Sequence, residues 1–219
     1  MTEKDFYKKA AIYWANVPAT IDGVLGGFGN FSDIDIDGSR AFLNKVLSSA
    51  NPPATKLALD CGAGIGRVTK HLLIHYFEKI DLVEPDLKFI TEAKINIGDD
   101  VTKLGTLYQT GLQNFRPHKN YDVIWCQWVL GHLNDSDLIK FLSRSKEALS
   151  KNGLIIIKEN ITTSKEVEYD EDDSSMTRPL ELMTKIFDQV NLRIIHSDIQ
   201  YGFPEDIYPI HCFALSPVQ

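Results

Sequence analysis

Apolar positions along the chain come in short blocks, and runs of strand length alternate with stretches of helical spacing. Five such runs lie at 57–59, 79–83, 106–109, 121–127 and 154–158. The run YDVIWCQ at 121–127 is almost continuously apolar, as expected for a parallel strand that is covered on both faces. Two last runs, 192–197 and 208–215, predict an antiparallel pair across a turn at 201–206. This order predicts an α/β fold with a doubly wound, mostly parallel, seven-stranded sheet.

The residues before the first strand predict an additional helical region. Apolar residues at helical spacing run over 1–17 and again over 36–49, where two prolines end the pattern. Between these helices, DGVLGGFG at 22–29 has four glycines among apolar residues, which predicts either a lid over a site or a joining loop. We expect one domain over the whole chain, with a helical lid region at 1–53 and a core at 54–219.

The most informative stretch is LALDCGAGIGR at 57–67, where a strand meets three alternating glycines and the start of a helix. Glycine reaches backbone angles closed to other residues and lets a ligand lie against the main chain. The N–H groups of such a turn and the helix dipole favour an electron-rich ligand. Glu84 stands twenty residues after Gly64, at the end of the next strand, where a carboxylate can accept hydrogen bonds from ribose hydroxyls. These features predict a site for a nucleoside-containing cofactor.

The spacing of the glycines indicates which cofactor is bound. A dinucleotide fingerprint reads G-x-G-x-x-G, but here the third glycine comes one residue early and Asp60 precedes the set. D-x-G-x-G-x-G is the pattern of S-adenosylmethionine-dependent methyltransferases, and Arg67 is positioned to reach the carboxylate of the cofactor's methionine. Leu112 and Gln113 follow the predicted strand 106–109 at the same sheet edge, where Gln113 either reads the adenine or caps its loop. The core is therefore predicted to bind this cofactor.

Composition and charge narrow the possible partners. With 219 residues, 43% of them apolar and 24% charged, the chain is long enough to bury a substantial core. A net charge of −7 and an isoelectric point near 5.3 argue against a nucleic acid and suit a small molecule or a basic peptide. Three cysteines without C-x-x-C spacing predict reduced thiols, and no membrane span or signal peptide is evident. We expect a cytoplasmic protein, and entry into the nucleus stays open.

Two histidines and an acidic run admit more than one interpretation. His71 and His75 stand four residues apart on one predicted helix, but they lack the glutamate of a zinc-binding H-E-x-x-H, so no metal site is predicted. EVEYDEDD at 166–173 is the densest acidic run of the chain and by itself is typical of a solvated loop. Ser174 and Ser175 are positioned to cap the helix that follows.

Six strings, in this order, resemble the eukaryotic protein N-terminal methyltransferases. They are DGVLGGFG, DCGAGIGR, YDVIWCQWVLGHL, NGLIIIKEN, DDSSMTR and FPEDIYP. The similarity runs from about Phe6 to the end of the chain, and QWVLGHL and DDSSMTR are its most specific parts. That family methylates the α-amine of proteins that begin X-Pro-Lys or X-Pro-Arg. The resemblance implies a class I, Rossmann-like fold, S-adenosylmethionine as cofactor, and a monomer acting on protein N-termini, ribosomal proteins among them.

The resemblance also assigns roles to residues, motif by motif. Cofactor contacts are implied for Gly62, Gly64, Arg67, Glu84, Pro85, Asp86, Leu112, Gln113 and Gln127. Substrate contacts are implied for Trp14, Leu25, Gly26, Trp128, Asn160, Asp170, Ser175 and Tyr208. Among these, Trp128 would pack on the proline and Asp170 would pair with the basic third residue. Asp173 and His132 are implied as bases, and the sequence does not divide this role between them.

The implied chemistry is consistent with the acidic residues of the chain. An α-amino group has a pKa of about 7.7 to 8.0, so a base must take a proton before the nitrogen attacks a methyl group. Two other hypotheses stay open on the sequence alone. One is a methyltransferase for a small molecule on the same scaffold, and the other is a regulatory module that binds the cofactor without catalysis.

Overall fold

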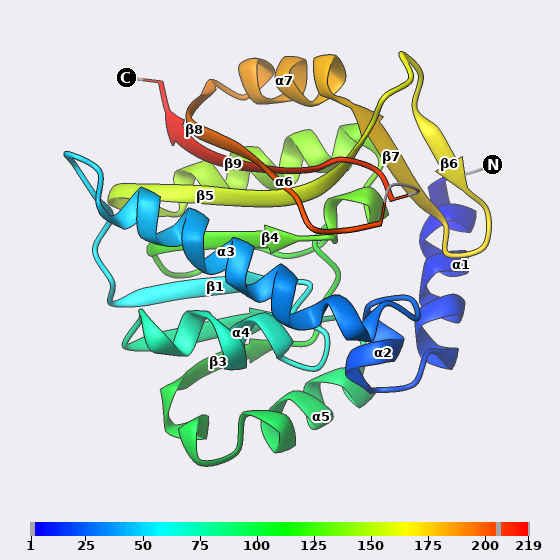
Figure 1. Ribbon diagram of the computed structural model, residues 1–219, viewed down its shortest axis with the longest axis horizontal. Coiled ribbons are helices and arrows are strands. Elements are labelled where there is room, and N and C mark those ends of the chain that lie inside the picture. Colours follow the sequence, from blue (N-terminus) through cyan, green and yellow to red (C-terminus); the bar gives the residue numbers. More distant parts are fainter. Residues whose placement is uncertain (1–2, 205–206, 219) are drawn as a thin grey trace.

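A single twisted sheet forms the centre of the molecule, and its strands run across the view in Figure 1. The computed structural model describes residues 3–204 and 207–218. The strands are β1 (Leu57–Cys61), β2 (Lys79–Val83), β3 (Leu104–Tyr108), β4 (Tyr121–Gln127), β5 (Leu149–Thr162), β6 (Glu168–Asp170), β7 (Ser175–Pro179), β8 (Leu192–Gln200) and β9 (Ile210–Pro217). In space the order is β3-β2-β1-β4-β5-β9-β8, with β9 antiparallel to both of its neighbours. The predicted mostly parallel arrangement is confirmed.

Helices cover both faces of the sheet. They are α1 (Glu3–Asn16), α2 (Ile21–Val24), α3 (Ser32–Leu47), α4 (Arg67–His71), α5 (Leu87–Ile97), α6 (Asp135–Glu147) and α7 (Leu180–Gln189), with 3-10 turns η1 (Gly29–Phe31), η2 (Leu73–His75), η3 (Gly98–Lys103) and η4 (Leu130–His132). Figure 1 shows α3 and α4 on one face and α6 and α7 on the other. Successive residues of a strand point to opposite faces, so Ile124 packs toward α6 and α7 while Trp125 packs toward α3 and α4.

The acidic run adopts a structure that its composition did not predict. Its residues Glu168–Asp170 form β6, which pairs with β7 in a hairpin, and β7 adds to the end of β5. The capping role predicted for Ser174 and Ser175 is wrong, because Ser175 begins β7 and helix α7 starts after Pro179. Ser174 instead turns the hairpin with φ of 57° and donates a hydrogen bond to the carbonyl oxygen of Phe6 at 3.0 Å.

Several helices and strands begin or end at residues other than those predicted. The single helix predicted to carry both His71 and His75 is interrupted at Leu72, so α4 ends at His71 and His75 lies in η2. The third strand begins at Leu104 and the fifth at Leu149, both earlier than predicted, and the last begins at Ile210 rather than at 208. Part of the predicted turn at 201–206, namely residues 205 and 206, lies outside the described residues, as do residues 1 and 2 of the first helix.

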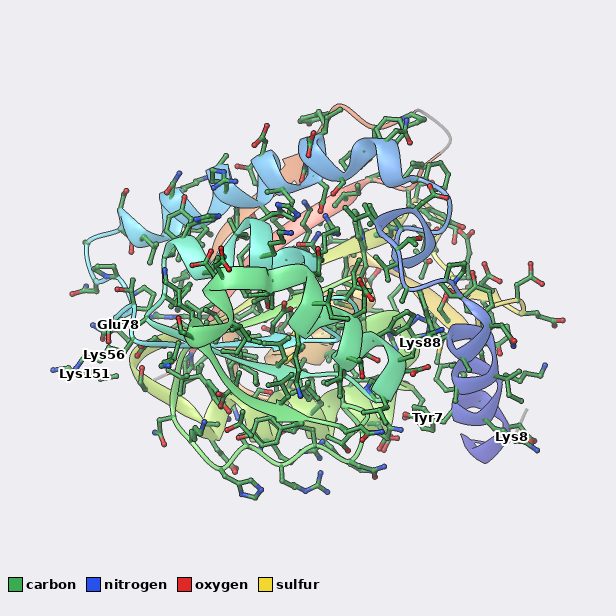
Figure 2. All side chains as sticks on the ribbon, turned by 90° about the horizontal axis from the view of Figure 1, so that it is seen from below. Tyr7, Lys8, Lys56, Glu78, Lys88 and Lys151 are labelled. Carbon is green, nitrogen blue, oxygen red and sulfur yellow. The ribbon has the colours of Figure 1, made fainter. Side chains whose placement is uncertain are left out.

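The N-terminal region stands at the carboxyl ends of the parallel strands, beside the β6–β7 hairpin (Figure 1). Tyr7 and Lys88 lie between α1 and the body of the protein in Figure 2. The Tyr7 hydroxyl donates to Asp137 Oδ2 at 2.7 Å. Lys88 Nζ donates to the carbonyl oxygens of Trp14, in the last turn of α1, and of Val17, just after the helix. These contacts hold α1 over the edge where the predicted site residues gather.

The described residues, 3–204 and 207–218, contain neither a membrane-spanning helix nor a cluster of metal ligands. No helix among them is long and apolar enough to cross a membrane. In the same part of the chain, no group of three or more histidine, cysteine, aspartate or glutamate side chains is arranged to hold a metal ion.

Candidate active site

Two adjoining cavities open at the carboxyl ends of the parallel strands. The first, of about 430 Å³, surrounds the turn after β1, and we call it the glycine-turn cavity. The second, of about 770 Å³, lies against β6 and β7, and we call it the hairpin cavity. Five residues line both cavities: Trp14, Val24, Leu25, Trp128 and His132. The cavities therefore meet at a wall built from α1, the glycine-rich loop and the segment after β4.

The glycine turn brings main-chain N–H groups and one buried carboxylate together. Gly62, Gly64 and Gly66 have φ values of 68°, 54° and 71°, in the left-handed region that favours glycine. The N–H of Gly64 donates to Glu84 Oε2 at 3.0 Å, which fixes this carboxylate at the cavity. Burial raises the pKa of Glu84 to about 7, against the opposing effect of two main-chain donors. A carboxylate at this depth is suited to accept hydrogen bonds from the hydroxyls of a ligand.

All nine residues predicted to contact the cofactor line the glycine-turn cavity. They are Gly62, Gly64, Arg67, Glu84, Pro85, Asp86, Leu112, Gln113 and Gln127. The cavity is also lined by Tyr7, Ala10 and Phe89, which the motifs did not identify. Tyr7, Ala10 and Trp14 recur at helical spacing on α1, so the pattern was visible, but only the structure shows which surface the helix turns toward.

Arg67 is held by partners from outside its own helix. Its Nη1 donates to Asp35 Oδ2 at 2.7 Å and to Ser32 Oγ at 3.4 Å, both on α3. The guanidinium carbon lies 5.9 Å from the centre of the Trp128 ring. A guanidinium has five N–H donors, and Arg67 lines the cavity, so it fits the carboxylate of a bound methionine as predicted. With Glu84 available for ribose hydroxyls, these residues fit S-adenosylmethionine.

The hairpin cavity is strongly acidic. Its lining includes seven carboxylate side chains: Asp35, Glu159, Glu168, Asp170, Glu171, Asp172 and Asp173. Among the described residues that line it there is no lysine or arginine. Like charges gathered around one concave surface attract a cation, so the cavity is complementary to a positively charged ligand.

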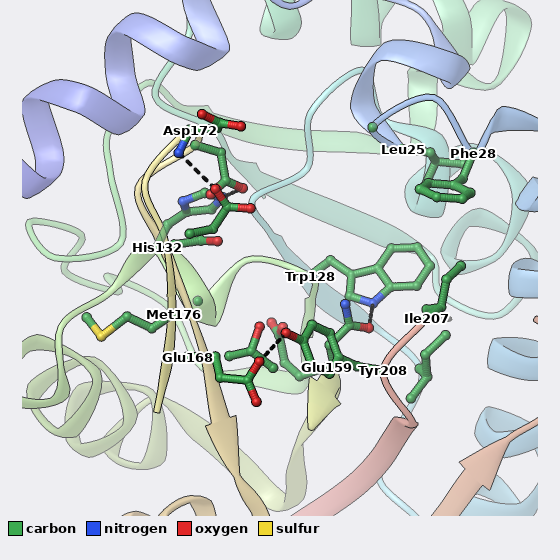
Figure 3. A pocket seen from close by; sticks show the side chains of 18 of the residues that line it. Leu25, Phe28, Trp128, His132, Glu159, Glu168, Asp172, Met176, Ile207 and Tyr208 are labelled. Atoms are coloured by element: carbon green, nitrogen blue, oxygen red, sulfur yellow. Dashed lines mark hydrogen bonds and ion pairs between the residues drawn. The ribbon is translucent and has the colours of Figure 1, made fainter. Parts of the chain in front are cut away.

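All ten residues predicted for substrate and catalysis line the hairpin cavity. They are Trp14, Leu25, Gly26, Trp128, His132, Asn160, Asp170, Asp173, Ser175 and Tyr208. Trp128 has φ of 50°, an uncommon value for a bulky residue, and its Nε1 donates to Asn160 Oδ1 at 3.2 Å. Figure 3 shows the Trp128 ring on one side of the cavity and His132 with Asp172 on the other.

His132 and Asp173 face each other beside Trp14. Nε2 of His132 accepts a hydrogen bond from Trp14 Nε1 at 3.1 Å, so this nitrogen carries no proton. Burial lowers the pKa of His132, although the charge of Asp173 opposes this effect. Oδ2 of Asp173 lies 4.0 Å from His132 Nε2, while Oδ1 is buried with no hydrogen-bond partner among the described residues. Such an unpartnered carboxylate oxygen is available to take a proton.

Two glutamates of the hairpin cavity were not predicted as site residues. Oε1 of Glu159 accepts from the N–H groups of Val129 and Leu130 at 2.7 and 2.8 Å, and it thereby holds the turn after Trp128. Glu168 Oε2 accepts from the Tyr208 hydroxyl at 2.5 Å, as Figure 3 shows. Glu159 directly follows the predicted strand 154–158, so its place at a strand end could be inferred from the sequence. Glu168 had no such signal, because its run was interpreted as a loop.

The chain is similar to known protein methyltransferases over almost its whole length. The family model described as AdoMet dependent proline di-methyltransferase matches residues 2–216. N-terminal Xaa-Pro-Lys N-methyltransferase 1 of Xenopus tropicalis is 44% identical over 216 residues, which are 97% of this chain and 96% of the relative. Alpha N-terminal protein methyltransferase 1 of Drosophila melanogaster is 44% identical over 99% of this chain and 78% of its own length.

Solved structures agree with these relatives. A SAM-dependent methyltransferase of Leishmania major is 37% identical and superposes with a TM-score of 0.89, over 96% of this chain and 83% of that one. The glycopeptide N-methyltransferase MtfA in complex with S-adenosylmethionine has a TM-score of 0.64 at 13% identity, over 84% of this chain and 87% of its own, and shows the fold alone. The chain therefore belongs to the family of AdoMet-dependent proline di-methyltransferases and is an S-adenosylmethionine-dependent methyltransferase of protein N-termini.

Proposed function

We propose that the enzyme methylates the free α-amine of proteins whose N-termini read X-Pro-Lys or X-Pro-Arg. The observation that carries this proposal is the wall that the two cavities share, because Trp14, Trp128 and His132 contact both. A peptide in the hairpin cavity thus ends beside the glycine-turn cavity, from which bound S-adenosylmethionine supplies the methyl group. Family membership and the names of the relatives support the same substrate class.

The lining of the hairpin cavity supports each position of this N-terminus. Trp128 offers an indole face to the proline at position two, and its bond to Asn160 fixes the ring. Asp170 is exposed at the cavity and is suited to pair with the basic residue at position three. The acidic lining as a whole attracts a peptide that carries both an ammonium group and a basic side chain.

Proton removal is the step that the protein's own side chains perform. An α-amine with a pKa of about 7.7 to 8.0 is mostly protonated near neutral pH. Oδ1 of Asp173 is buried and unpartnered among the described residues, which supports Asp173 as the proton acceptor. His132 Nε2 already accepts from Trp14, so we assign the role of base to Asp173 rather than to His132.

A peptide assay tests the proposal. The purified protein is incubated with S-adenosylmethionine and peptides that begin Ser-Pro-Lys or Pro-Pro-Lys, and mass spectrometry follows gains in steps of one methyl group. We expect methylation of both peptides and none of their N-acetylated forms, whose terminal nitrogen is blocked. Labelling of the acetylated peptides would identify a lysine side chain as the acceptor and contradict the proposal. Turnover of a small amine without any turnover of the peptides would favour a metabolite methyltransferase.

Cofactor affinity is expected to depend on pH through Glu84. Burial raises the pKa of Glu84 from 4.5 to about 7. Ribose hydroxyls donate to the ionised carboxylate, so below pH 7 Glu84 must lose a proton before the ligand binds. The Kd of S-adenosylhomocysteine should therefore fall by about tenfold from pH 6 to pH 8. Calorimetric titration measures this, and the Glu84→Gln variant should show weaker binding with the slope lost. An identical slope in that variant would assign the dependence to another group.

Three further statements stay predictions. They are that ribosomal proteins are among the substrates, that the enzyme is a monomer, and that it acts in the cytoplasm, with entry into the nucleus left open. The first is supported by the acidic lining of the hairpin cavity, and the other two are expectations from the sequence.

A further inference from the structure

Asp35 is the centre of a buried cluster that joins the lid region to both cavities. It lies on α3, its side chain is fully buried, and it forms part of the lining of the hairpin cavity. Its carboxylate accepts hydrogen bonds from three residues: Arg67 at 2.7 Å, Gln127 at 2.7 and 2.9 Å, and Lys158. Two of these donors, Arg67 and Gln127, line the glycine-turn cavity. Asp35 itself was not among the residues that the sequence motifs identified.

The cluster fixes its members in one arrangement. Lys158 is 0% exposed, and its Nζ also donates to the carbonyl oxygen of Asp35 and to Ser39 Oγ, each at 2.9 Å. Gln127 Oε1 accepts from Trp125 Nε1 at 3.1 Å, so both ends of this amide are used. Arg67 Nη1 is bonded to both Asp35 and Ser32, and Gln127 is bonded through its amide nitrogen and its amide oxygen. Both side chains therefore have little freedom to rotate.

The way Arg67 is held leaves part of its guanidinium for a ligand. Asp35 and Ser32 both accept from Nη1, and no bond from Nε or Nη2 to protein occurs among the described residues. The ring of Trp128 lies 5.9 Å from the guanidinium carbon. Asp35 thus takes one nitrogen on the α3 side, and the other N–H groups remain for the cavity that Arg67 lines.

The net charge of the cluster also favours a ligand carboxylate at Arg67. Arg67 and Lys158 are cations and Asp35 is the anion between them, so the three groups together carry one positive charge. A ligand carboxylate that meets Arg67 completes the balance in a place where water is scarce. The ion pair with Asp35 fixes the position of the Arg67 guanidinium from the α3 side.

We propose that Asp35 is a positioning residue for the cofactor, which it serves by holding Arg67 toward the carboxylate of S-adenosylmethionine, with Gln127 bracing Asp35 from the other side. The inference rests on the cofactor role proposed for Arg67. It gives helix α3 of the lid region an indirect part in cofactor recognition, through Arg67, although α3 carries no recognised cofactor motif. The residue assigned to the ribose, Glu84, follows β2 and has no hydrogen bond to Asp35 among the described residues, so the expected effect of Asp35 is confined to the carboxylate.

The test compares two ligands that differ by one group. S-adenosylhomocysteine carries the carboxylate, and its decarboxylated analogue S-adenosyl-3-thiopropylamine lacks only that group. Titration calorimetry gives the Kd of each for the wild type and for Asp35→Asn, which keeps the size of the side chain. We expect the Kd of S-adenosylhomocysteine to rise by about tenfold or more and that of the analogue to stay within about twofold. The control is Asp122→Asn, which changes another buried carboxylate, bonded to Lys56 and Leu57 N–H groups.

Three outcomes would overturn the inference. Equal weakening of both ligands would mean that Asp35 only maintains the fold. Unchanged or tighter binding of S-adenosylhomocysteine would mean that the charge of Asp35 merely compensates those of Arg67 and Lys158. A full further loss when Asp35→Asn is added to Arg67→Gln would mean that Asp35 does not act through Arg67, because two residues on one route are not additive.

A second variant keeps the test decisive if Asp35→Asn does not fold cooperatively. Asp35→Asn combined with Lys158→Met removes one charge of each sign and leaves the net charge of the cluster unchanged. The same selective loss is expected there. If the ratio of the two ligands' Kd values equals that of the wild type, the inference is contradicted. If Arg67→Gln alone does not distinguish the two ligands, the role of Arg67 is wrong while peptide methylation, measured separately, can still stand.

Discussion

Replacing Asp173 with asparagine is expected to lower kcat for an X-Pro-Lys peptide by about 10²- to 10⁴-fold. Asparagine has nearly the size of aspartate, but it cannot take a proton from an ammonium group. Oδ1 of Asp173 is buried without a partner among the described residues, so no neighbouring hydrogen bond competes for this proton. The substrate amine then stays protonated, and its nitrogen has no lone pair with which to attack the methyl group.

Single-turnover measurements on the peptide, with saturating S-adenosylmethionine, check this expectation. Asp172→Asn is the matched control, because it removes the same charge from the neighbouring exposed residue and should change the rate by less than about tenfold. Raising the pH should restore part of the activity of Asp173→Asn, since the amine then loses its proton to solvent. A rate within about threefold of wild type at pH 7 would exclude Asp173 as the base and leave His132 as the candidate.

Substituting Gly62 with alanine is expected to damage both the fold and cofactor binding. Gly62 has φ of 68°, and a Cβ atom there would lie 2.3 Å from Val129 Cγ2. The left-handed backbone costs an alanine about 1–2 kcal/mol, and displacing Val129 adds about 1–3 kcal/mol. Val129 belongs to the turn that Glu159 holds after Trp128, so its displacement also disturbs the wall shared by the two cavities.

Urea unfolding and titration with S-adenosylhomocysteine measure the two effects. Gly26→Ala is the control, because Gly26 has φ of 60° but a Cβ atom there would meet nothing within 4 Å. We expect Gly26→Ala to show the backbone cost alone, with the Kd of S-adenosylhomocysteine unchanged, and Gly62→Ala to raise that Kd by at least about tenfold. Equal stability and equal Kd values for the two variants would show that the contact with Val129 relaxes without consequence.

The expected residues of each cavity were found because their signals are local. A glycine that needs positive φ, a carboxylate at a strand end and an aromatic residue after a strand are all written in short stretches of sequence. Parallel strands deliver such residues to one edge, so Gly64, Glu84 and Trp128 had to meet once the strand order was correct. The motifs of the family resemblance supplied the remaining assignments, including those on α1.

The hairpin and the cluster around Asp35 had no comparable signal. EVEYDEDD has the composition of a solvated loop, but β6 pairs with β7, β7 pairs with the end of β5, and Ser174 bonds to Phe6 of α1. Strand pairing of this kind depends on partners that are far away along the chain. Lys158 likewise interrupts an apolar strand, and nothing near it in sequence indicates that its partner is Asp35, 123 residues earlier.

By itself, the sequence determined the alternation of strands and helices, the glycine turn and the chemistry of the residues at the strand ends. These follow from periodicity and backbone preference, which act over a few residues. Only the tertiary structure decided that two cavities share one wall, that an acidic run closes the larger one, and that Asp35 holds Arg67. The physical reason is that a buried charge is stable only beside its partners, and packing alone chooses which distant residues those are.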